Sequence, residues 1–79
     1  MSLQEFIGKF AEQFDETDAG EFKPDTKYKA LADWTSMTAL LIIAMVSDEY
    51  DVIIKGDDIR SSETIEDLFN IVMGYKAQT

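Results

Sequence analysis

The sequence predicts a small all-α bundle with three main helices, one short helix and a long loop after the first helix. Two stretches near the ends of the chain repeat apolar residues at helical spacing. Between them, residues 36–50 contain no glycine or proline and are too many for an ordinary strand. With 79 residues in all, 1–79 is expected to be a single domain with one modest core.

Composition excludes several kinds of site. The chain has no cysteine, which rules out disulfides, thiolate metal ligands and a cysteine nucleophile, and which suits a cytoplasmic setting. It has no histidine either, so neither a serine triad nor a histidine metal site can form, and a self-contained hydrolase is not expected. Its N-terminal residues do not resemble a signal peptide, and its central apolar run is too short to span a bilayer.

The charge of the chain indicates the kind of partner to expect. Sixteen acidic residues against seven basic ones give a net charge of −9. Phosphate contacts need lysine and arginine, and anionic membranes repel such a chain, so neither nucleic acid nor membrane insertion is expected. The field attracts basic protein surfaces instead. The alternative is that the acidity only keeps a small protein soluble.

Residues 3–14 are predicted to form an amphipathic helix. Ser2 followed by Glu5 is a capping-box pattern. The apolar positions recur at helical spacing and are Leu3, Phe6, Ile7, Phe10 and Phe14.

Residues 15–30 are polar and contain Gly20 and the only proline, Pro24, so they are predicted to form a long loop. Loops of this length are uncommon in small domains and often functional. We expect Phe22 and Tyr28 to pin the loop to the core. The end of this loop, residues 28–31, is expected to form a turn of helix.

The acidic loop invites a calcium site, but its spacing does not fit one. With Gly20 at the sixth position of an EF-hand loop, Ala19 lacks a ligand oxygen and Thr26 stands where glutamate is needed. The acid pairs Asp48–Glu49 and Asp57–Asp58 have no clustered third ligand. Solvated carboxylates are therefore expected, and no metal site.

Residues 36–50 are predicted to form the second helix, with Thr35 or Ser36 as its N-cap. On a helical wheel, one face holds Ala39, Leu40, Ile43, Val46 and Tyr50. The other face holds Thr38, Leu41, Met45 and Asp48. A helix that is apolar nearly all round is either sandwiched between other helices or contacts a partner through its outer face.

The rest of the chain predicts a link, a helical turn and a last helix. Residues 51–54 are expected to be extended, and residues 57–60 to form one brief turn. Thr64 followed by Asp67 resembles a capping box. The last helix should end near Tyr75, and its apolar stripe consists of Ile65, Leu68, Phe69 and Val72.

Three features spaced along the chain together resemble the acyl carrier protein family. Ser36-Met37 opens the apolar second helix, where that family usually has Asp-Ser-Leu. Tyr50-Asp51 follows fourteen residues after the serine and ends an acidic stretch, as an aromatic residue and aspartate do in the family. Residues 64–68, Thr-Ile-Glu-Asp-Leu, match the family's Thr-x-x-Asp/Glu-Leu start of the last helix. The resemblance covers the whole chain in length and helix order, and it implies an acyl-carrier-like four-helix bundle.

The resemblance implies a discrete carrier protein rather than an enzyme. In that family the serine, here Ser36, carries covalent 4′-phosphopantetheine, which a separate phosphopantetheinyl transferase supplies from coenzyme A with magnesium. Thr35 and Met37 flank this site. The arm's thiol would carry fatty acyl, polyketide or aminoacyl intermediates as thioesters. The expected partners are the transferase and the acyl-loading and chain-elongating enzymes with basic docking surfaces, and the protein is expected to be a cytoplasmic monomer.

The chain departs from the family pattern beside the serine and along the second helix. Thr35 replaces the usual aspartate and Met37 the usual leucine, so one charge beside the attachment site is lost. The second helix is the family's docking face, and here it has few acids, which favours a specialised carrier with partly apolar partners. The expected docking residues are Thr38, Leu41, Met45, Asp48 and Glu49. In the alternative, the long loop covers Leu41 and Met45.

The resemblance also implies a pocket between helices for the acyl chain. Its candidate lining residues are Leu40, Ile43, Val46, Tyr50, Ile59, Ile65 and Leu68. Each of them is also an ordinary core residue, which is the simpler interpretation, and Ile54 fits either class.

Two other interpretations use the same residues. An acidic helical adaptor without a cofactor would bind a partner helix along the face of Leu41 and Met45. A catalytic Ser36–Lys29 dyad would need the lysine against the hydroxyl, and nothing in the sequence places it there. Ser36 is otherwise an ordinary helix cap.

Overall fold

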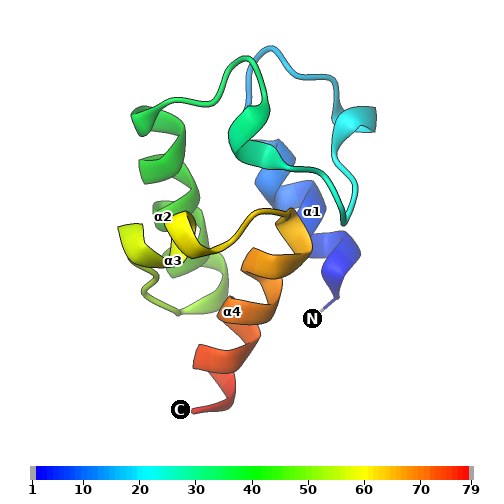
Figure 1. Ribbon diagram of the computed structural model, residues 1–79. Helices are drawn as coiled ribbons and strands as arrows, with labels where there is room; N and C mark the ends of the chain where they lie inside the picture. Colours follow the sequence, from blue (N-terminus) through cyan, green and yellow to red (C-terminus); the bar gives the residue numbers. More distant parts are fainter. Residues whose placement is uncertain (1, 79) are drawn as a thin grey trace.

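Four α-helices make up most of the computed structural model (Figure 1). They are α1 (Leu3–Ala11), α2 (Ser36–Tyr50), α3 (Gly56–Ser61) and α4 (Ile65–Ala77). Helix α1 packs against both α2 and α4, and the short α3 packs against α4. The prediction of a small all-α bundle with three main helices and one short helix is confirmed.

The structure describes residues 2–78, so the two ends of the predicted domain, Met1 and Thr79, lie outside it. Within this range the only β-type pairing is an isolated bridge between Lys27 and Thr64. None of the helices described combines the length and the hydropathy that crossing a bilayer requires.

Helix α1 begins where predicted but is shorter. Ser2 Oγ accepts a hydrogen bond from the Glu5 amide at 3.1 Å, which is one half of the predicted capping box. After Ala11 the backbone tightens into i→i+3 bonds, the last of which runs from the Phe14 amide to the Ala11 carbonyl at 3.1 Å. Phe14 therefore stays buried although it lies outside the helix.

The predicted long loop is an irregular segment with two short 3-10 turns. These are η1 (Ala19–Glu21) and η2 (Tyr28–Ala30). The second of them is the turn expected at residues 28–31. In Figure 1 the segment arches over one end of the bundle between α1 and α2.

Aromatic rings fix this loop to the core. Phe22 and Tyr28 are both buried, as predicted. The Tyr28 ring lies edge-to-face against Phe10 and Trp34, with ring centroids 5.1 Å apart in both pairs. The Tyr28 hydroxyl also shares a short hydrogen bond with the fully buried Ser62. The segment that leads into α2 is thus held by ring packing and by a buried hydrogen bond.

Helix α2 has the predicted bounds because both of its ends are specified locally. Thr35 is the N-cap, and Asp51 ends the helix in the left-handed region at φ 57° and ψ 40°. In the link that follows, Val52 and Ile54 are buried and Ile53 is exposed, which is the alternation of an extended segment.

Helix α4 begins with the predicted capping box. Thr64 Oγ1 accepts a hydrogen bond from the Asp67 amide, and the Asp67 carboxylate accepts one from the Thr64 amide, both at 3.1 Å. The helix continues to Ala77, slightly beyond the predicted end. Near that end, Lys76 Nζ donates to the Tyr50 carbonyl at 2.9 Å, which joins the last turn of α4 to the end of α2.

Candidate functional site

Ser36 is the first residue of α2, and its side chain is exposed. Its hydroxyl makes no hydrogen bond to any described residue. The first backbone hydrogen bond of the helix runs from the Ala39 amide to the Thr35 carbonyl at 3.1 Å. The amides before Ala39 therefore give this end of the helix a positive partial charge.

A network of threonine hydroxyls holds the start of α2. Thr35 Oγ1 accepts from the Thr38 amide at 3.2 Å, and Thr38 Oγ1 accepts from the Thr35 amide at 3.3 Å. Thr38 Oγ1 also lies 3.1 Å from the Asp33 carbonyl, to which it donates. Because Thr35 performs the capping, the hydroxyl of Ser36 is not needed for it.

Asp33 anchors the long loop next to this helix end. Its carboxylate accepts hydrogen bonds from the Glu16 and Thr17 amides at 3.1 Å each, and from the Thr17 hydroxyl. These bonds, led by the one from the Thr17 hydroxyl, lower the pKa of Asp33 below its ordinary value. The residues before α2 are therefore tied to the residues after α1.

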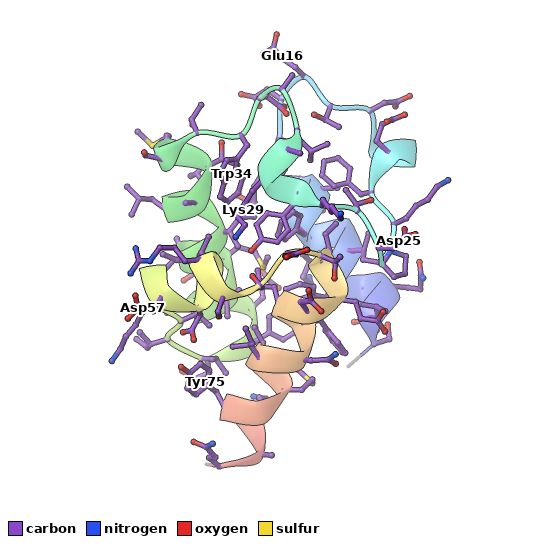
Figure 2. The ribbon with its side chains drawn as sticks, viewed as in Figure 1. Glu16, Asp25, Lys29, Trp34, Asp57 and Tyr75 are labelled. Carbon is purple, nitrogen blue, oxygen red and sulfur yellow. The ribbon has the colours of Figure 1, made fainter. Side chains whose placement is uncertain are left out.

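A surface groove of about 460 Å³ opens beside Ser36, between α2 and α3. It is lined from α2 by Ser36, Ala39, Leu40 and Ile43, from α3 by Gly56, Ile59 and Arg60, and from the preceding loop by Lys29, Trp34 and Thr35. Figure 2 shows Trp34 and Lys29 close together beside α2. The groove is mostly apolar, and its volume lies within the range of about 300–1,000 Å³ that is usual for ligand pockets.

Lys29 connects this groove to the end of α3. Its ammonium donates to the carbonyl oxygens of Ile59 and Arg60 at 2.9 and 3.0 Å. Cationic side chains are favourable at the C-terminal end of a helix, where carbonyl groups lack intrahelical partners. Both hydrogen bonds direct the ammonium towards α3, and it makes none with the Ser36 hydroxyl.

Arg60 is the second cation at the groove. Its guanidinium pairs with Asp57 on the exposed surface of α3. The side chain folds back over Gly56, where an added Cβ would lie 3.4 Å from Arg60 Nη1. Basic side chains near Ser36 are few in the sequence, but folding brings these two to the groove that Ser36 also lines.

The predicted acyl-pocket residues divide into two groups. Leu40, Ile43 and Ile59 line the groove beside Ser36. The others do not line it, and they are core residues with exposed fractions of 4% or less: Val46, Tyr50, Ile65 and Leu68. Ile54, which fits either class, is also buried in the core. These positions agree with the simpler interpretation, in which the residues belong to the ordinary core.

The inner face of α2 differs from the one predicted. Ile42 is fully buried, whereas Leu40 is 60% exposed. The buried residues of the helix are Thr38, Ile42, Met45, Val46 and Tyr50. Because the helix is apolar nearly all round, its own pattern gave no signal for this orientation.

Two of the predicted docking residues are buried. Thr38 and Met45 are each only 6% exposed, so the prediction that they contact partners is wrong. The Thr38 hydroxyl belongs to the cap of α2, and Met45 lies next to α1, beside Lys9 and Gln13.

The other predicted docking residues are at the surface. Leu41 is 42% exposed, which contradicts the alternative that the long loop covers it, and Asp48 and Glu49 are exposed. Glu49 pairs with Lys9 of α1 at 2.9 Å, and this contact raises the pKa of Lys9. Met37 is 64% exposed and joins Leu40 and Leu41 in an exposed apolar set at the start of α2, which we call the α2 apolar face.

Sequence patterns assign no site role to five of the residues that line the groove: Lys29, Trp34, Ala39, Gly56 and Arg60. For Ala39 a signal was available, because it shares a wheel face with Leu40 and Ile43 and lies one turn after Ser36. Trp34 and Arg60 come from segments that only the fold brings together.

No group of three or more acidic residues among residues 2–78 is arranged to hold a metal ion. Comparisons of this chain with models of known protein families, with the curated proteins and with the solved structures found no match.

Proposed function

We propose that this protein is a discrete carrier of the acyl carrier type, with Ser36 as the attachment site of 4′-phosphopantetheine. The observation that carries the proposal is the state of the Ser36 hydroxyl. It is exposed, free of hydrogen bonds to described residues, and located at the positive end of α2 beside an apolar groove. The sequence resemblance supports the same role through the spacing of Ser36, Tyr50-Asp51 and residues 64–68.

In the attachment step, Ser36 Oγ bonds to the phosphorus of the pantetheine phosphate. The pyrophosphate bond of coenzyme A breaks, adenosine 3′,5′-bisphosphate leaves, and the hydroxyl proton passes to a base of the transferase. This chain needs only to present the hydroxyl, since the transferase and its magnesium supply the catalysis. The amides of the first turn of α2 provide a favourable environment for the resulting phosphodiester.

The attached arm supplies a thiol, which this cysteine-free chain lacks, and the thiol carries acyl groups as thioesters. Helix α3 and the loop before α2 form the walls of the groove that would shelter such a group. Lys29 holds these two walls together through the carbonyls of Ile59 and Arg60.

The enzymes that serve this carrier would dock on the outer side of α2. The α2 apolar face lies directly after Ser36, and Asp48 and Glu49 lie at the other end of the helix. A complementary enzyme surface would combine an apolar patch near its active site with basic residues farther away. This mixed surface supports a specialised carrier.

The proposal is tested by incubating the purified protein with coenzyme A, magnesium and a broad-range transferase, and then measuring its intact mass. The expected result is the addition of one phosphopantetheine arm. Ser36→Ala should abolish the addition, whereas Ser61→Ala, which removes another exposed serine hydroxyl, should leave it unchanged. Absence of any addition with several transferases would contradict the proposal.

A second candidate is an acidic helical adaptor that carries no cofactor. The exposure of Met37, Leu40 and Leu41 favours it, because an unpartnered apolar helix face is a common binding surface. The mass measurement separates the two candidates, since an adaptor gains no arm.

A further inference from the structure

The groove beside Ser36 has a charge opposite to that of the protein as a whole. The chain has a net charge of −9, with 16 carboxylate residues. Yet the groove is lined by two cationic residues, Lys29 and Arg60, and none of its described lining residues is Asp or Glu. A cleft lined by charges of one sign focuses their field and attracts counter-ions. The groove therefore favours an anionic group that the rest of the surface repels.

Neither cation has an ionic partner among the residues that line the groove. The hydrogen-bond partners of Lys29 are two backbone carbonyls, which carry no net charge. Arg60 pairs with Asp57, but both side chains are largely exposed, at 74% and 85%. Exposed ion pairs of this kind are weak, so the guanidinium can exchange that partner for another anion.

The remaining lining suits an apolar chain. The apolar lining consists of Ala39, Leu40 and Ile43 from α2, Ile59 from α3 and Trp34 from the loop before α2. A ligand that matches both properties has an apolar stem and an anionic end. If the proposed function holds, the group that occupies the groove is tethered to Ser36.

We propose that the groove selects acyl cargo that ends in a carboxylate, such as the half-thioester of a dicarboxylic acid, over neutral acyl chains of the same length. The apolar stem packs between α2 and α3, and the carboxylate pairs with Arg60 and Lys29. This proposal rests on the proposed function, because it concerns the cargo of the arm on Ser36. Its test is designed so that the two can fail separately.

The test uses chemical tethering in place of the transferase. The chain has no cysteine, so Ser36→Cys introduces a single thiol. Its thiolate displaces iodide from N-alkyl iodoacetamides of one length that end in a methyl group, a carboxamide or a carboxylate. The single tryptophan, Trp34, lines the groove, so its fluorescence reports whether the tethered chain occupies it. Methyl NMR shifts of Ile43 and Ile59 confirm the location.

The carboxylate chain is expected to occupy the groove about twofold to fivefold more than either neutral chain, as estimated for a partly exposed charge pair. Arg60→Gln should reduce that preference, because only Lys29 is left to pair with the carboxylate, and about 1 M salt should weaken it. Lys23→Gln, at an exposed lysine that does not line the groove, should leave it intact. Equal occupancy by all three chains, or a preference that is undiminished in Arg60→Gln, would overturn the proposal.

A second experiment tests whether the anion that binds the groove is the carboxylate of the cargo or the phosphodiester of the attached arm. Holo protein made with a transferase is loaded with a monocarboxylic or a dicarboxylic acyl group of equal length. If attachment of the arm alone produces the whole Arg60-dependent change and the cargo carboxylate adds nothing, the groove binds the phosphodiester and the cargo proposal is wrong. If the arm cannot be attached, the proposed function is contradicted. The tethering experiment would then still show whether the groove prefers a chain that ends in a carboxylate.

Discussion

The Lys29 ammonium lies 2.9 Å from the carbonyl oxygen of Ile59 and ties the loop before α2 to the C-terminal end of α3. The two residues are thirty positions apart, and together they set the distance between two walls of the groove. The Tyr28 and Ser62 hydroxyls also lie within hydrogen-bond distance of this carbonyl; because one of them donates to the other, only the second donates to Ile59. These contacts hold the end of α3 against the loop before α2, so the shape of the groove depends on them.

Removing the Lys29 ammonium should weaken the contact between the loop before α2 and the end of α3. Lys29→Met keeps most of the aliphatic stem but loses both hydrogen bonds to α3. We expect the free energy of unfolding to fall by about 1–2 kcal/mol, because bonds to a charged donor are lost at a partly buried site. Urea denaturation measures the loss, and faster amide exchange in α3 locates it. Lys23→Met should change stability by less than about 0.5 kcal/mol, and an equal loss in both variants would contradict this role.

The Asp33 anchor predicts a specific pH dependence. Its pKa is lowered by the hydrogen bonds from Thr17 and Glu16, so its contribution to stability is present above the unfolded-state pKa of about 3.9. That contribution is lost as the pH falls through the lower pKa of the folded state. Asp33→Asn should therefore be less stable than the wild type at neutral pH, and the difference should shrink in acid.

Denaturation at a series of pH values measures this difference. Asp25→Asn is the matched control, because Asp25 is an exposed carboxylate in the same loop. The difference in stability between Asp33→Asn and the wild type should shrink at low pH. If it stays constant at low pH, the charge of the Asp33 carboxylate is not responsible for it.

Two buried tyrosines should respond oppositely to loss of their hydroxyl groups. The Tyr50 hydroxyl is buried and has no hydrogen-bond partner among residues 2–78, whereas the Tyr28 hydroxyl bonds to Ser62 and Ile59. Tyr50→Phe removes an unsatisfied polar group, so stability should be unchanged or rise by up to about 1 kcal/mol. Tyr28→Phe removes a hydroxyl that is hydrogen-bonded in the core and should cost about 1 kcal/mol, while Ser62 keeps the Ile59 carbonyl as its acceptor. Thermal unfolding of the pair checks the contrast, and a larger loss for Tyr50→Phe would contradict it.

These contacts also show which parts of the structure the sequence could predict. The bounds of α2 followed from Thr35 and from fifteen residues without glycine or proline, since caps and breakers act locally. The start of α4 followed from Thr64 and Asp67 for the same reason. The end of α1 was placed too late, because the apolar repeat continues to Phe14 while the backbone has already tightened.

The groove could be predicted only in part. Residues 39–46 of α2 are all apolar, so the orientation of the helix depends on the neighbours that cover it rather than on its own period. The helical wheel therefore predicts Thr38 and Met45 at the surface and assigns Ile42 to neither face. The meeting of Lys29 with Arg60 depends on a contact between distant segments, which no local pattern specifies.

Restoring the acid that usually precedes the family's serine should improve modification. In Thr35→Asp the new carboxylate can still accept the Thr38 amide, and its charge is favourable at the positive end of α2. We expect stability to change by less than about 1 kcal/mol and the rate of arm transfer by a broad-range transferase to rise. Thr35→Ala, which loses the cap, should be less stable by about 1 kcal/mol. A transfer rate in Thr35→Asp that is equal to or below that of the wild type would show that the missing aspartate does not limit recognition of this chain by the transferase.

The most direct test of the central claim is to locate the attached arm by fragmentation mass spectrometry. Cleavage after lysine gives a peptide of residues 30–55, which contains Thr35, Ser36, Thr38 and Ser47. We expect every fragment that carries the phosphopantetheine mass to include Ser36, and Ser36→Ala to yield no modified peptide. An arm found on another hydroxyl, or an unmodified peptide after treatment with several transferases, would contradict it.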